Sequence, residues 1–264
     1  MNILEKIIAH KRDEVARRKG ERSIAELERG PFYKNETYSL KQFLLDESRT
    51  GIIAEYKRKS PSKGIINDRA SVEEVTSAYA AYGASGISVL TDEAFFGGTL
   101  ADLQKAAILN KLPLLRKDFI IDEYQIYEAK AYGASVILLI AANLAVAEVK
   151  SLAHVAKGLN LEVLLEVHNE EELEHICDEV DLVGVNNRNL KTFEVSLEQS
   201  AHLSSLIPKD KIRISESGIN KVGDILYLKE HGYKGFLIGE SFMKEDDPGA
   251  AFMSFVEELK GAKS

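Results

Sequence analysis

The sequence of 264 residues predicts an α/β fold, a single (β/α)8 (TIM) barrel domain that spans residues 1–264. The first observation behind this prediction is a set of short apolar runs, most of them continuously hydrophobic, as in parallel strands covered on both faces. The second is a helical pattern between successive runs, so that strands and helices alternate. The predicted strands are residues 52–56, 86–90, 112–115, 135–140, 161–167, 181–185, 211–215 and 234–238.

An internal repeat supports the barrel. AYGASGISVL at 81–90 and AYGASVILLI at 131–140 share a helix end, a glycine and a strand, and HGYKGFLIG at 231–239 repeats the pattern loosely. The spacing of the first two copies corresponds to two strand-and-helix units. A doubly wound open sheet is the alternative, and it is disfavoured because no glycine-rich dinucleotide-binding turn is visible.

Two amphipathic segments precede the first predicted strand. Residues 3–19 place apolar side chains near one stripe of a helix that ends at Gly20, and residues 39–47 form a second expected helix. We therefore expect residues 1–48 to form a helical N-terminal extension that packs on the barrel and lies outside its repeat.

Start and stop signals delimit the helices of the repeat. A polar N-cap residue followed three positions later by an acid or an amide has the spacing of a capping box. Such pairs are Ser71 and Glu74, Thr99 and Asp102, Asp122 and Gln125, and Asn169 and Glu172. Gly83, Gly133 and Gly232 stand where glycines are expected just after a helix.

Composition and charge exclude several classes of protein. No apolar run approaches the roughly 18 to 20 residues of a bilayer-spanning helix, and the N-terminus lacks the apolar core of a secretory signal. The formal net charge of −8 argues against nucleic-acid binding, which needs a basic face. The one cysteine, Cys177, cannot form an internal disulfide, so we expect a cytoplasmic protein.

Polar side chains follow most of the predicted strands. The carboxyl ends of all strands of a (β/α)8 barrel meet at one mouth, where active sites are built. Because side chains alternate along a strand, Glu55 and Lys57 should face the same side at the end of the first run. The other strand-end groups are Thr91, Asp92, Glu93, Arg116, Lys117, Asp118, Glu166, Asn186, Asn187, Arg188, Ser215, Glu216, Ser217, Gly218, Gly239, Glu240 and Ser241.

Two interpretations of these charges are open. They could form a ring of salt bridges that only stabilises the mouth, although desolvating so many charges costs more than hydrophobic substitutes would. Alternatively, lysines and glutamates with shifted pKa values could serve as acid and base near neutral pH. No cluster of His or Cys has the spacing of metal ligands, so we expect chemistry without a metal. The histidines are scattered, and most are expected at the surface or on helices.

The last two strand ends have the features of a phosphate site. SESG at 215–218 and IGES at 238–241 place glycine amides and small side chains where barrels commonly bind phosphate, although Gly-Ser pairs elsewhere are ordinary turns. Ser60, in the loop after the first strand, could add a hydroxyl group.

The same loop carries the densest basic cluster of the chain. Such a cluster is often only a solvated loop. We assign Lys57 to the chemistry and expect Arg58, Lys59 and Lys63 to form a mobile rim, which would attract an anion to a protein of net negative charge.

A series of motifs in this chain resembles one family, indole-3-glycerol phosphate synthase of tryptophan biosynthesis. The resemblance extends from the N-terminal helical extension to DDPGAA at 246–251. The motifs that carry it are AEYKRKSPSKG, LTDEAFFGGTLADL, LLRKDFIIDEYQI, LLEVHNEEEL, VGVNNRNLKTFEV, ISESGI and IGESFM.

The resemblance implies a carboxy-lyase without a cofactor. Its substrate would be a phosphorylated small molecule, 1-(2-carboxyphenylamino)-1-deoxyribulose 5-phosphate, which is closed to indole-3-glycerol phosphate with loss of CO2 and water. Attack of an aromatic carbon on a carbonyl needs a proton for the developing alkoxide and a cation near the carboxylate. Two lysines at a mouth with little water can supply both.

The residue roles follow from the same resemblance. Lys117 matches the general acid that protonates the carbonyl oxygen, and Glu166 matches an acid/base group. Lys57 also meets the substrate carboxylate, and which of Glu55 and Lys57 acts in dehydration stays open. The implied catalytic residues are Glu55, Lys57, Lys117, Glu166, Asn186 and Ser217; the implied substrate-binding residues are Ser60, Phe119 (on the aromatic ring), Arg188 and Glu216; the implied phosphate-binding residues are Ser60, Gly218, Gly239 and Ser241.

Other functions remain as alternatives. A lyase or aldolase barrel of class I would form a Schiff base on a strand-end lysine, a phosphoribosyl isomerase barrel would act in a related biosynthesis, and a phosphate-sensing barrel would bind without turnover. We also expect a monomer that contacts neighbouring tryptophan-pathway enzymes transiently, with neither nucleic acid nor a membrane as partner.

Overall fold

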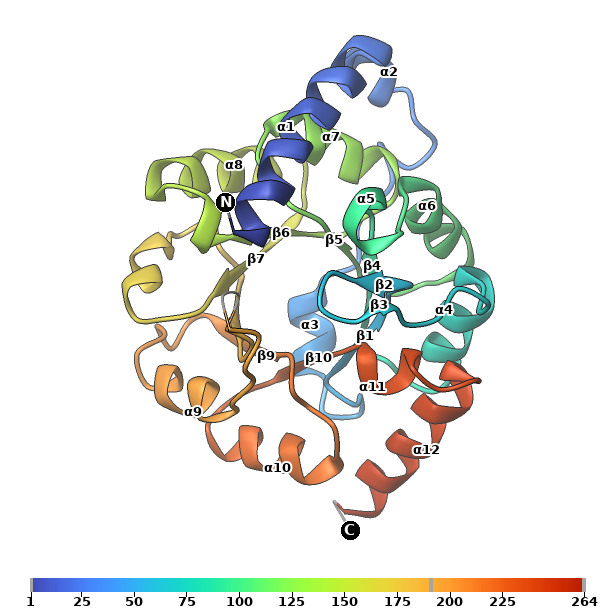
Figure 1. Ribbon diagram of the computed structural model, residues 1–264, viewed down its shortest axis with the longest axis vertical. Coiled ribbons are helices and arrows are strands. Elements are labelled where there is room, and N and C mark those ends of the chain that lie inside the picture. Colours follow the sequence, from blue (N-terminus) through green and yellow to red (C-terminus); the bar gives the residue numbers. More distant parts are fainter. Residues whose placement is uncertain (1, 190–191, 263–264) are drawn as a thin grey trace.

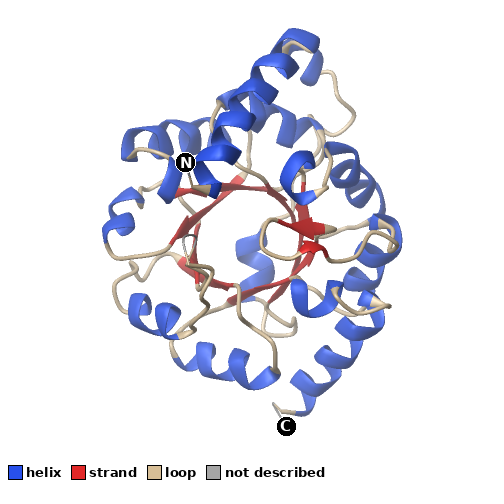
Figure 2. Ribbon diagram, viewed as in Figure 1, coloured by secondary structure: helices blue, strands red, loops and turns tan. Residues whose placement is uncertain are grey.

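Eight parallel strands form a closed barrel in the computed structural model, which describes residues 2–189 and 192–262. Figure 2 shows the ring of strands with helices around it. The order around the barrel is β1, β10, β9, β8, β7, β6, β5 and β4, and β1 closes the ring because it pairs with both β10 and β4. The strands are β1 (Ile52–Tyr56), β4 (Gly86–Leu90), β5 (Leu114–Lys117), β6 (Val136–Ile140), β7 (Glu162–Val167), β8 (Leu182–Asn186), β9 (Ile212–Glu216) and β10 (Gly235–Ile238). The predicted barrel is confirmed and the open sheet is excluded.

The run at 112–115 is the one for which the predicted bounds were wrong by more than one residue. The strand there, β5, covers Leu114–Lys117. Pro113 has no N–H to donate to a ladder, so pairing begins after it, while its carbonyl accepts the N–H of Ile87 at 3.0 Å. The polar residues Arg116 and Lys117 are consequently part of the strand.

The apolar core consists of two layers. Inside the barrel, alternate strand residues such as Leu115, Leu164 and Ile214 form one buried cluster. Leu40 and Leu44 of α3 (Leu40–Leu45) belong to the same cluster, so α3 closes the end of the barrel opposite the mouth. Figure 1 shows α3 behind the ring of strands. A larger cluster lies between the strands and the surrounding helices.

The outer helices alternate with the strands, as predicted. The longer ones are α4 (Val72–Ala81), α6 (Leu100–Leu109), α7 (Glu123–Ala131), α8 (Val146–Gly158), α9 (Glu198–Ser204), α10 (Val222–Glu230) and α12 (Pro248–Gly261). The short ones are α5 (Glu93–Phe96), α11 (Glu240–Met243) and the 3-10 helices η1 (Ala141–Asn143) and η2 (Glu171–His175). No helix among the described residues is long and apolar enough to cross a membrane.

Most of the predicted helix signals are confirmed. Ser71 and Thr99 accept the backbone N–H three residues on, and the glycines after α4, α7 and α10 have the left-handed φ angles of 94°, 89° and 82°. The box predicted at Asp122 is wrong, because Gln125 turns back to accept the N–H of Ile121. Asn169 does accept the backbone N–H of Glu172, but the segment between β7 and β8 forms the 3-10 helix η2 and not an α-helix.

The N-terminal extension begins with α1 (Ile3–Glu21), followed by α2 (Ile24–Leu27) and α3. Helix α1 runs past Gly20 by one residue, and α3 is shorter than the predicted 39–47. In Figure 1, α1 lies across one side of the barrel beside α7. The extension thus closes one end of the barrel with α3 and borders the opposite mouth with α1.

The loop after β1 contains an element that the sequence did not predict. Residues Lys59–Ser60 (β2) and Gly64–Ile65 (β3) pair as a small antiparallel hairpin. Figures 1 and 2 show this hairpin in front of the ring of strands.

Candidate active site

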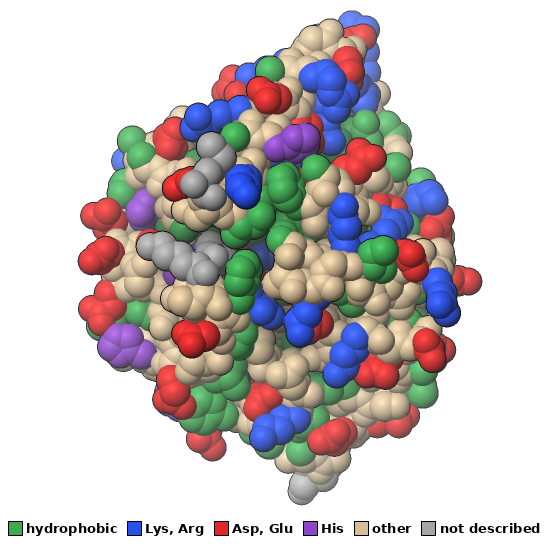
Figure 3. All heavy atoms as spheres, viewed as in Figure 1, with side chains coloured by type: hydrophobic (Ala, Val, Ile, Leu, Met, Phe, Trp, Pro, Cys, Tyr) green, Lys and Arg blue, Asp and Glu red, His purple; other side chains and the backbone are tan. Residues whose placement is uncertain are grey.

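A cavity opens at the carboxyl ends of the strands, where the barrel prediction places the active site. Its polar lining consists of Glu55, Lys57, Ser60, Ser62, Lys117, Asp118, Glu166, Asn186, Arg188, Glu216, Ser217 and Glu240. Figure 3 shows hydrophobic and basic side chains gathered around the middle of this face, whereas the acidic side chains lie mostly around its periphery.

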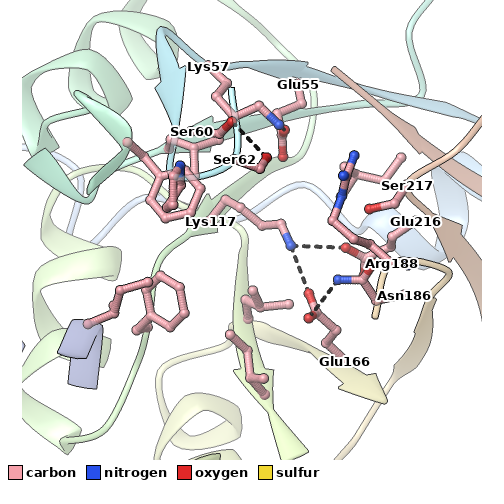
Figure 4. Close-up of a pocket in the computed structure, with 18 of the residues that line it drawn as sticks. Glu55, Lys57, Ser60, Ser62, Lys117, Glu166, Asn186, Arg188, Glu216 and Ser217 are labelled. Atoms are coloured by element: carbon pink, nitrogen blue, oxygen red, sulfur yellow. Dashed lines mark hydrogen bonds and ion pairs between the residues drawn. The ribbon is translucent and has the colours of Figure 1, made fainter. Parts of the chain in front are cut away.

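Lys117 stands between two buried carboxylates at the centre of the cavity. Its Nζ atom lies 2.9 Å from Glu166 Oε2 and 3.0 Å from Glu216 Oε2 (Figure 4). The three residues come from β5, β7 and β9, which are far apart in the sequence. The barrel thus brings together three strand ends that the sequence predicted to converge.

Burial and charge act against each other at this lysine. Burial disfavours the charge on Lys117, but Glu166, Glu216 and Glu55 outweigh it, so the pKa of Lys117 is raised above its ordinary value. Burial likewise opposes the charge on Glu166, yet Lys117 and His168 hold the pKa of Glu166 well below its ordinary value. Lys117 is therefore a cation at neutral pH.

Glu216 differs from its neighbour Glu166. The pKa of Glu216 is raised to about 7, chiefly by burial. The negative charges of Glu166 and Glu55 also raise this pKa, whereas the positive charge of Lys117 lowers it. Its Oε1 atom is buried and has no hydrogen-bond partner. The two carboxylates share one lysine, so they titrate as a coupled pair, with the pKa of Glu166 lowered and that of Glu216 raised.

A second lysine and glutamate lie at the end of β1. Lys57 Nζ is 2.8 Å from Glu55 Oε1, and Ser88 donates to the other oxygen of Glu55 at 3.3 Å. Gly239, at the end of β10, lies against this glutamate, because a Cβ atom there would come within 2.7 Å of Glu55 Oε1. Glycine at this position leaves the space that Glu55 occupies.

Asn186 orients Glu166. Its Nδ2 donates to Glu166 Oε1 at 3.0 Å (Figure 4). Its Oδ1 accepts the backbone N–H of Arg188 at 3.0 Å. The guanidinium of Arg188 lies 3.6 Å from Glu240 at the rim.

Ser217 follows β9 in a left-handed conformation, with φ 66°. The buried Asn187 donates to the carbonyl of Ser217 at 3.0 Å and also to that of Glu216. Sequence analysis placed Asn187 at a strand end but gave it no role. The structure shows that its side chain fixes the turn carrying Ser217.

The predicted phosphate residues lie together, with one exception. Gly218, Gly239 and Ser241 line a hollow next to the main cavity. Lys57, Lys63 and Arg188 also line it, so three cations face the hollow. Ser60 instead lines the main cavity, with its hydroxyl 3.4 Å from that of Ser62. The structure thus separates Ser60 from the other three residues.

An apolar wall completes the cavity. The ring of Phe119 lies 5.9 Å from that of Phe96, measured between centroids. Ile3, Leu4 and Ile7 of α1 add to this wall, which sequence analysis did not foresee because it placed the extension outside the site. The wall offers an aromatic ligand a surface for packing.

The predicted mobile basic rim is wrong for Arg58 and Lys59. Arg58 forms two hydrogen bonds with Asp102, at 2.6 and 2.8 Å, and stacks over Tyr56 at 5.0 Å from its centroid. Lys59 donates to the carbonyl of Ala94 at 2.8 Å. Both side chains anchor the loop after β1, and Lys63, 3.6 Å from Glu240, is the cation of this rim that lines the hollow.

His168 is the nearby group that sequence analysis missed. It was counted among histidines expected at the surface or on helices, but its side chain is 12% exposed and its Nε2 lies 3.3 Å from Glu166 Oε1. The signal was available, because residues 166 and 168 have the same spacing as Glu55 and Lys57.

Among residues 2–189 and 192–262, no group of three or more His, Cys, Asp or Glu side chains is arranged to hold a metal ion. The expectation of chemistry without metal or cofactor stays a prediction.

Comparison with known families shows one match over nearly the whole chain. The family described as "Indole-3-glycerol phosphate synthase" matches residues 4–255. Two curated relatives of that name are similar in sequence. The one from Bacteroides thetaiotaomicron is 47% identical, with 98% of this chain and 99% of the relative covered. The one from Bordetella pertussis is 42% identical, with 97% and 99% covered.

Solved structures with a similar fold include a chain of the tryptophan synthase complex from Pyrococcus furiosus. The TM-score is 0.61, the sequence identity is 17%, and 81% of this chain and 99% of that chain are covered. At this identity the similarity concerns the barrel fold alone.

Proposed function

The chain belongs to the indole-3-glycerol phosphate synthase family, and from that premise we propose that it closes the ring of 1-(2-carboxyphenylamino)-1-deoxyribulose 5-phosphate. The products would be indole-3-glycerol phosphate, CO2 and water, as for a carboxy-lyase of tryptophan biosynthesis. The observation that carries this proposal is the position of Lys117 between Glu166 and Glu216, at a cavity with an apolar wall.

The two hollows of the mouth fit the two ends of this substrate. The apolar wall with Phe119 would pack on the aromatic ring, and Lys57 would pair with its carboxylate. The phosphate would bind near Gly218, Gly239 and Ser241. Arg188 lines both hollows and would reach the middle of the substrate.

Lys117 would act as the general acid of ring closure. The ring carbon that carries the carboxylate attacks the ketone carbon, the electrons of the C=O bond move to oxygen, and Lys117 gives that oxygen a proton. Its raised pKa keeps the amine protonated until an alkoxide, which is a much stronger base, forms beside it. The bond to CO2 then breaks, and its electrons restore the aromatic ring.

Dehydration would use the acids and bases that remain in the same cavity. The C–OH bond breaks as the leaving oxygen accepts a proton, and a base takes a proton from the neighbouring carbon of the new ring. Glu166, Glu55 and Lys57 are candidates for these transfers, since all three line the cavity.

The charge state of Lys117 argues against the Schiff-base alternative. A Schiff base needs a neutral amine as nucleophile. Glu166 and Glu216 hold Lys117 protonated, and Glu55 lies 2.8 Å from the other lysine. Lys117, whose pKa these carboxylates raise, is therefore not available as a neutral nucleophile.

The direct test is incubation with the carboxyphenylamino substrate while indole fluorescence is followed, together with borohydride trapping. We expect fluorescence to rise in step with CO2 release and no covalent adduct. Turnover of a phosphosugar with capture on Lys117 or Lys57 would contradict the proposal. Lys105→Ala, which alters an exposed pair with Glu73, is the control.

The proposal includes a monomeric, cytoplasmic protein that folds as one unit over residues 1–264. Size-exclusion chromatography and a single unfolding transition would support these points. Transient contact with neighbouring pathway enzymes is part of the same proposal.

A further inference from the structure

The carboxylate of Glu166 is held by different groups at its two oxygens. Lys117 lies against Oε2, the oxygen that faces the cavity lysine. Asn186 and His168 lie against Oε1, at 3.0 and 3.3 Å. Lys117 can therefore leave Glu166 for a substrate while the other oxygen keeps its contacts.

His168 lies between Glu166 and a second carboxylate, that of Glu172. Its Nδ1 lies 3.1 Å from Glu172 Oε2. The contact of Nε2 with Glu166 is within ion-pair distance but is not an aligned hydrogen bond. Glu166, His168 and Glu172 thus form a row of carboxylate, imidazole and carboxylate that runs from the cavity to η2.

Glu172 has a fixed orientation. Its Oε2 also accepts the backbone N–H of His168 at 2.7 Å, and its Oε1 accepts from Asn169 at 3.1 Å. The carbonyl of His168 accepts from Gln199 of α9. A ring held in this way has one orientation available, with Nε2 toward Glu166.

The reaction creates a need for a second cation. When Lys117 gives its proton to the substrate, it becomes neutral and Glu166 loses its counter-ion. A buried carboxylate without a counter-ion takes up a proton and can no longer act as a base.

We propose that His168, backed by Glu172, is a positioning residue that keeps Glu166 ionised and aligned after Lys117 has turned to the substrate. This inference rests on the proposed function, in which Glu166 acts as an acid/base group. His168 does not touch the substrate; it acts through Glu166.

The charges around His168 support an imidazolium. The groups that face it are Glu166 from β7 and Glu172 from η2, with Asn186 and Gln199 as neutral neighbours and Lys117 beyond Glu166. Burial lowers the pKa of His168, but the two glutamates outweigh burial and raise it to about 10. The ring therefore carries a positive charge at the pH where the enzyme would work.

The first test needs no substrate and is therefore independent of the proposed function. Histidine labelled in the imidazole ring is titrated by NMR, with His168 assigned by its loss in His168→Gln. We expect His168 to stay protonated above pH 8 and to titrate at least one pH unit lower in Glu166→Gln, since one of its two counter-charges is removed. A neutral His168 at pH 7 would overturn the inference.

The second test is the pH dependence of kcat. His168→Gln keeps a polar side chain but no cation, so the pKa of Glu166 should rise and the acid limb of kcat should move up by about one pH unit. We expect the loss of kcat to be largest on the acid side of the shifted limb, up to about tenfold for a shift of one unit, while KM changes little. Glu172→Gln should move the limb in the same direction by less.

A matched control is present in the chain. His202 and Glu170 form a comparable pair at 2.6 Å, but both are exposed, and His202→Gln should leave the pH profile unchanged. A merely structural His168 would lower stability without moving the acid limb, and that result would contradict the inference.

Discussion

Two clusters of buried charge lie back to back on β5, and they differ in what surrounds them. Leu115 and Lys117 face the inside of the barrel, whereas Arg116 faces the helices. Lys117 belongs to the cavity cluster, which comprises Glu55, Lys57, Lys117, Glu166 and Glu216. Arg116 belongs to the helix-side cluster, which comprises Lys11, Glu14, Arg18, Asp92, Arg116, Asp118 and Glu128.

The helix-side cluster is closed. Lys11 of α1 lies 2.8 Å from Asp92 and 2.9 Å from Asp118, and none of the three side chains has any exposed surface. Arg116 continues the chain of ion pairs from Asp118 to Glu128. Each carboxylate has a cation within ion-pair distance, although Asp92 Oδ2 makes no aligned hydrogen bond, and the cluster fastens α1 to the ends of β4 and β5.

The cavity cluster is open. Glu216 has a buried oxygen without a partner, and its pKa is raised to about 7. Gly184 leaves room for this oxygen, since a Cβ atom there would come within 2.2 Å of it. The comparison teaches that burial of charge alone does not identify a reactive site. An acid that lines a cavity and has a raised pKa, as Glu216 does, identifies one.

Replacement of a glutamate by glutamine should have the most different effects in the two clusters. We expect Glu166→Gln to lower kcat by about 10²- to 10⁴-fold, which is typical of losing a positioned acid/base group. Steady-state kinetics would show it. Glu128→Gln, the same change in the helix-side cluster, should lower stability and leave kcat nearly unchanged. A change of KM alone in Glu166→Gln would make Glu166 a binding residue.

Removal of the central lysine of the closed cluster should affect folding. Lys11→Met leaves Asp92 and Asp118 without this counter-ion, so we expect the free energy of unfolding to fall by about 3 kcal/mol or more. Denaturant titration would measure it, with kcat of the folded enzyme within several-fold of the original. Arg17→Ala, at an exposed pair with Glu21, is the control and should cost less than about 1 kcal/mol. An equal loss in both variants would contradict the contrast.

The smallest expected effect is a rise in the free energy of unfolding when Glu216 of the cavity cluster is replaced. Because the folded pKa of Glu216 lies above the unfolded value of about 4.3, the folded state holds its proton longer. This residue therefore costs stability as pH rises from about 4.3 through about 7. Glu216→Gln should raise the free energy of unfolding at pH 8 by about 1 to 2 kcal/mol, while turnover falls. Equal free energies of unfolding for Glu216→Gln and the original protein at pH 8 would show that the buried carboxylate of Glu216 does not destabilise the fold.

Local sequence patterns were sufficient for the barrel but not for the whole site. Runs of apolar residues and capping signals predicted the strands, and strand ends predicted that Glu55, Lys117, Glu166 and Glu216 would meet. These features follow from periodicity along a few residues and from the topology of one fold.

The features that were missed depend on distant pairs. Arg58 and Asp102 are 44 residues apart, and Lys11 meets Asp118 across the boundary between the extension and the barrel. No local periodicity encodes such partners, so a basic loop was expected where an anchored one exists. His168 was within reach, because the alternation used for Glu55 and Lys57 applies equally to residues 166 and 168.

The most direct test of the contrast between the two clusters is a joint measurement of kcat and the free energy of unfolding for Lys117→Ala. We expect turnover of the carboxyphenylamino substrate to be abolished, because the proton donor is lost, while the fold stays intact, because no apolar core is removed. Near-original kcat would show that Lys117 is not the acid. Loss of the fold would show that the cavity cluster is structural, as the helix-side cluster is.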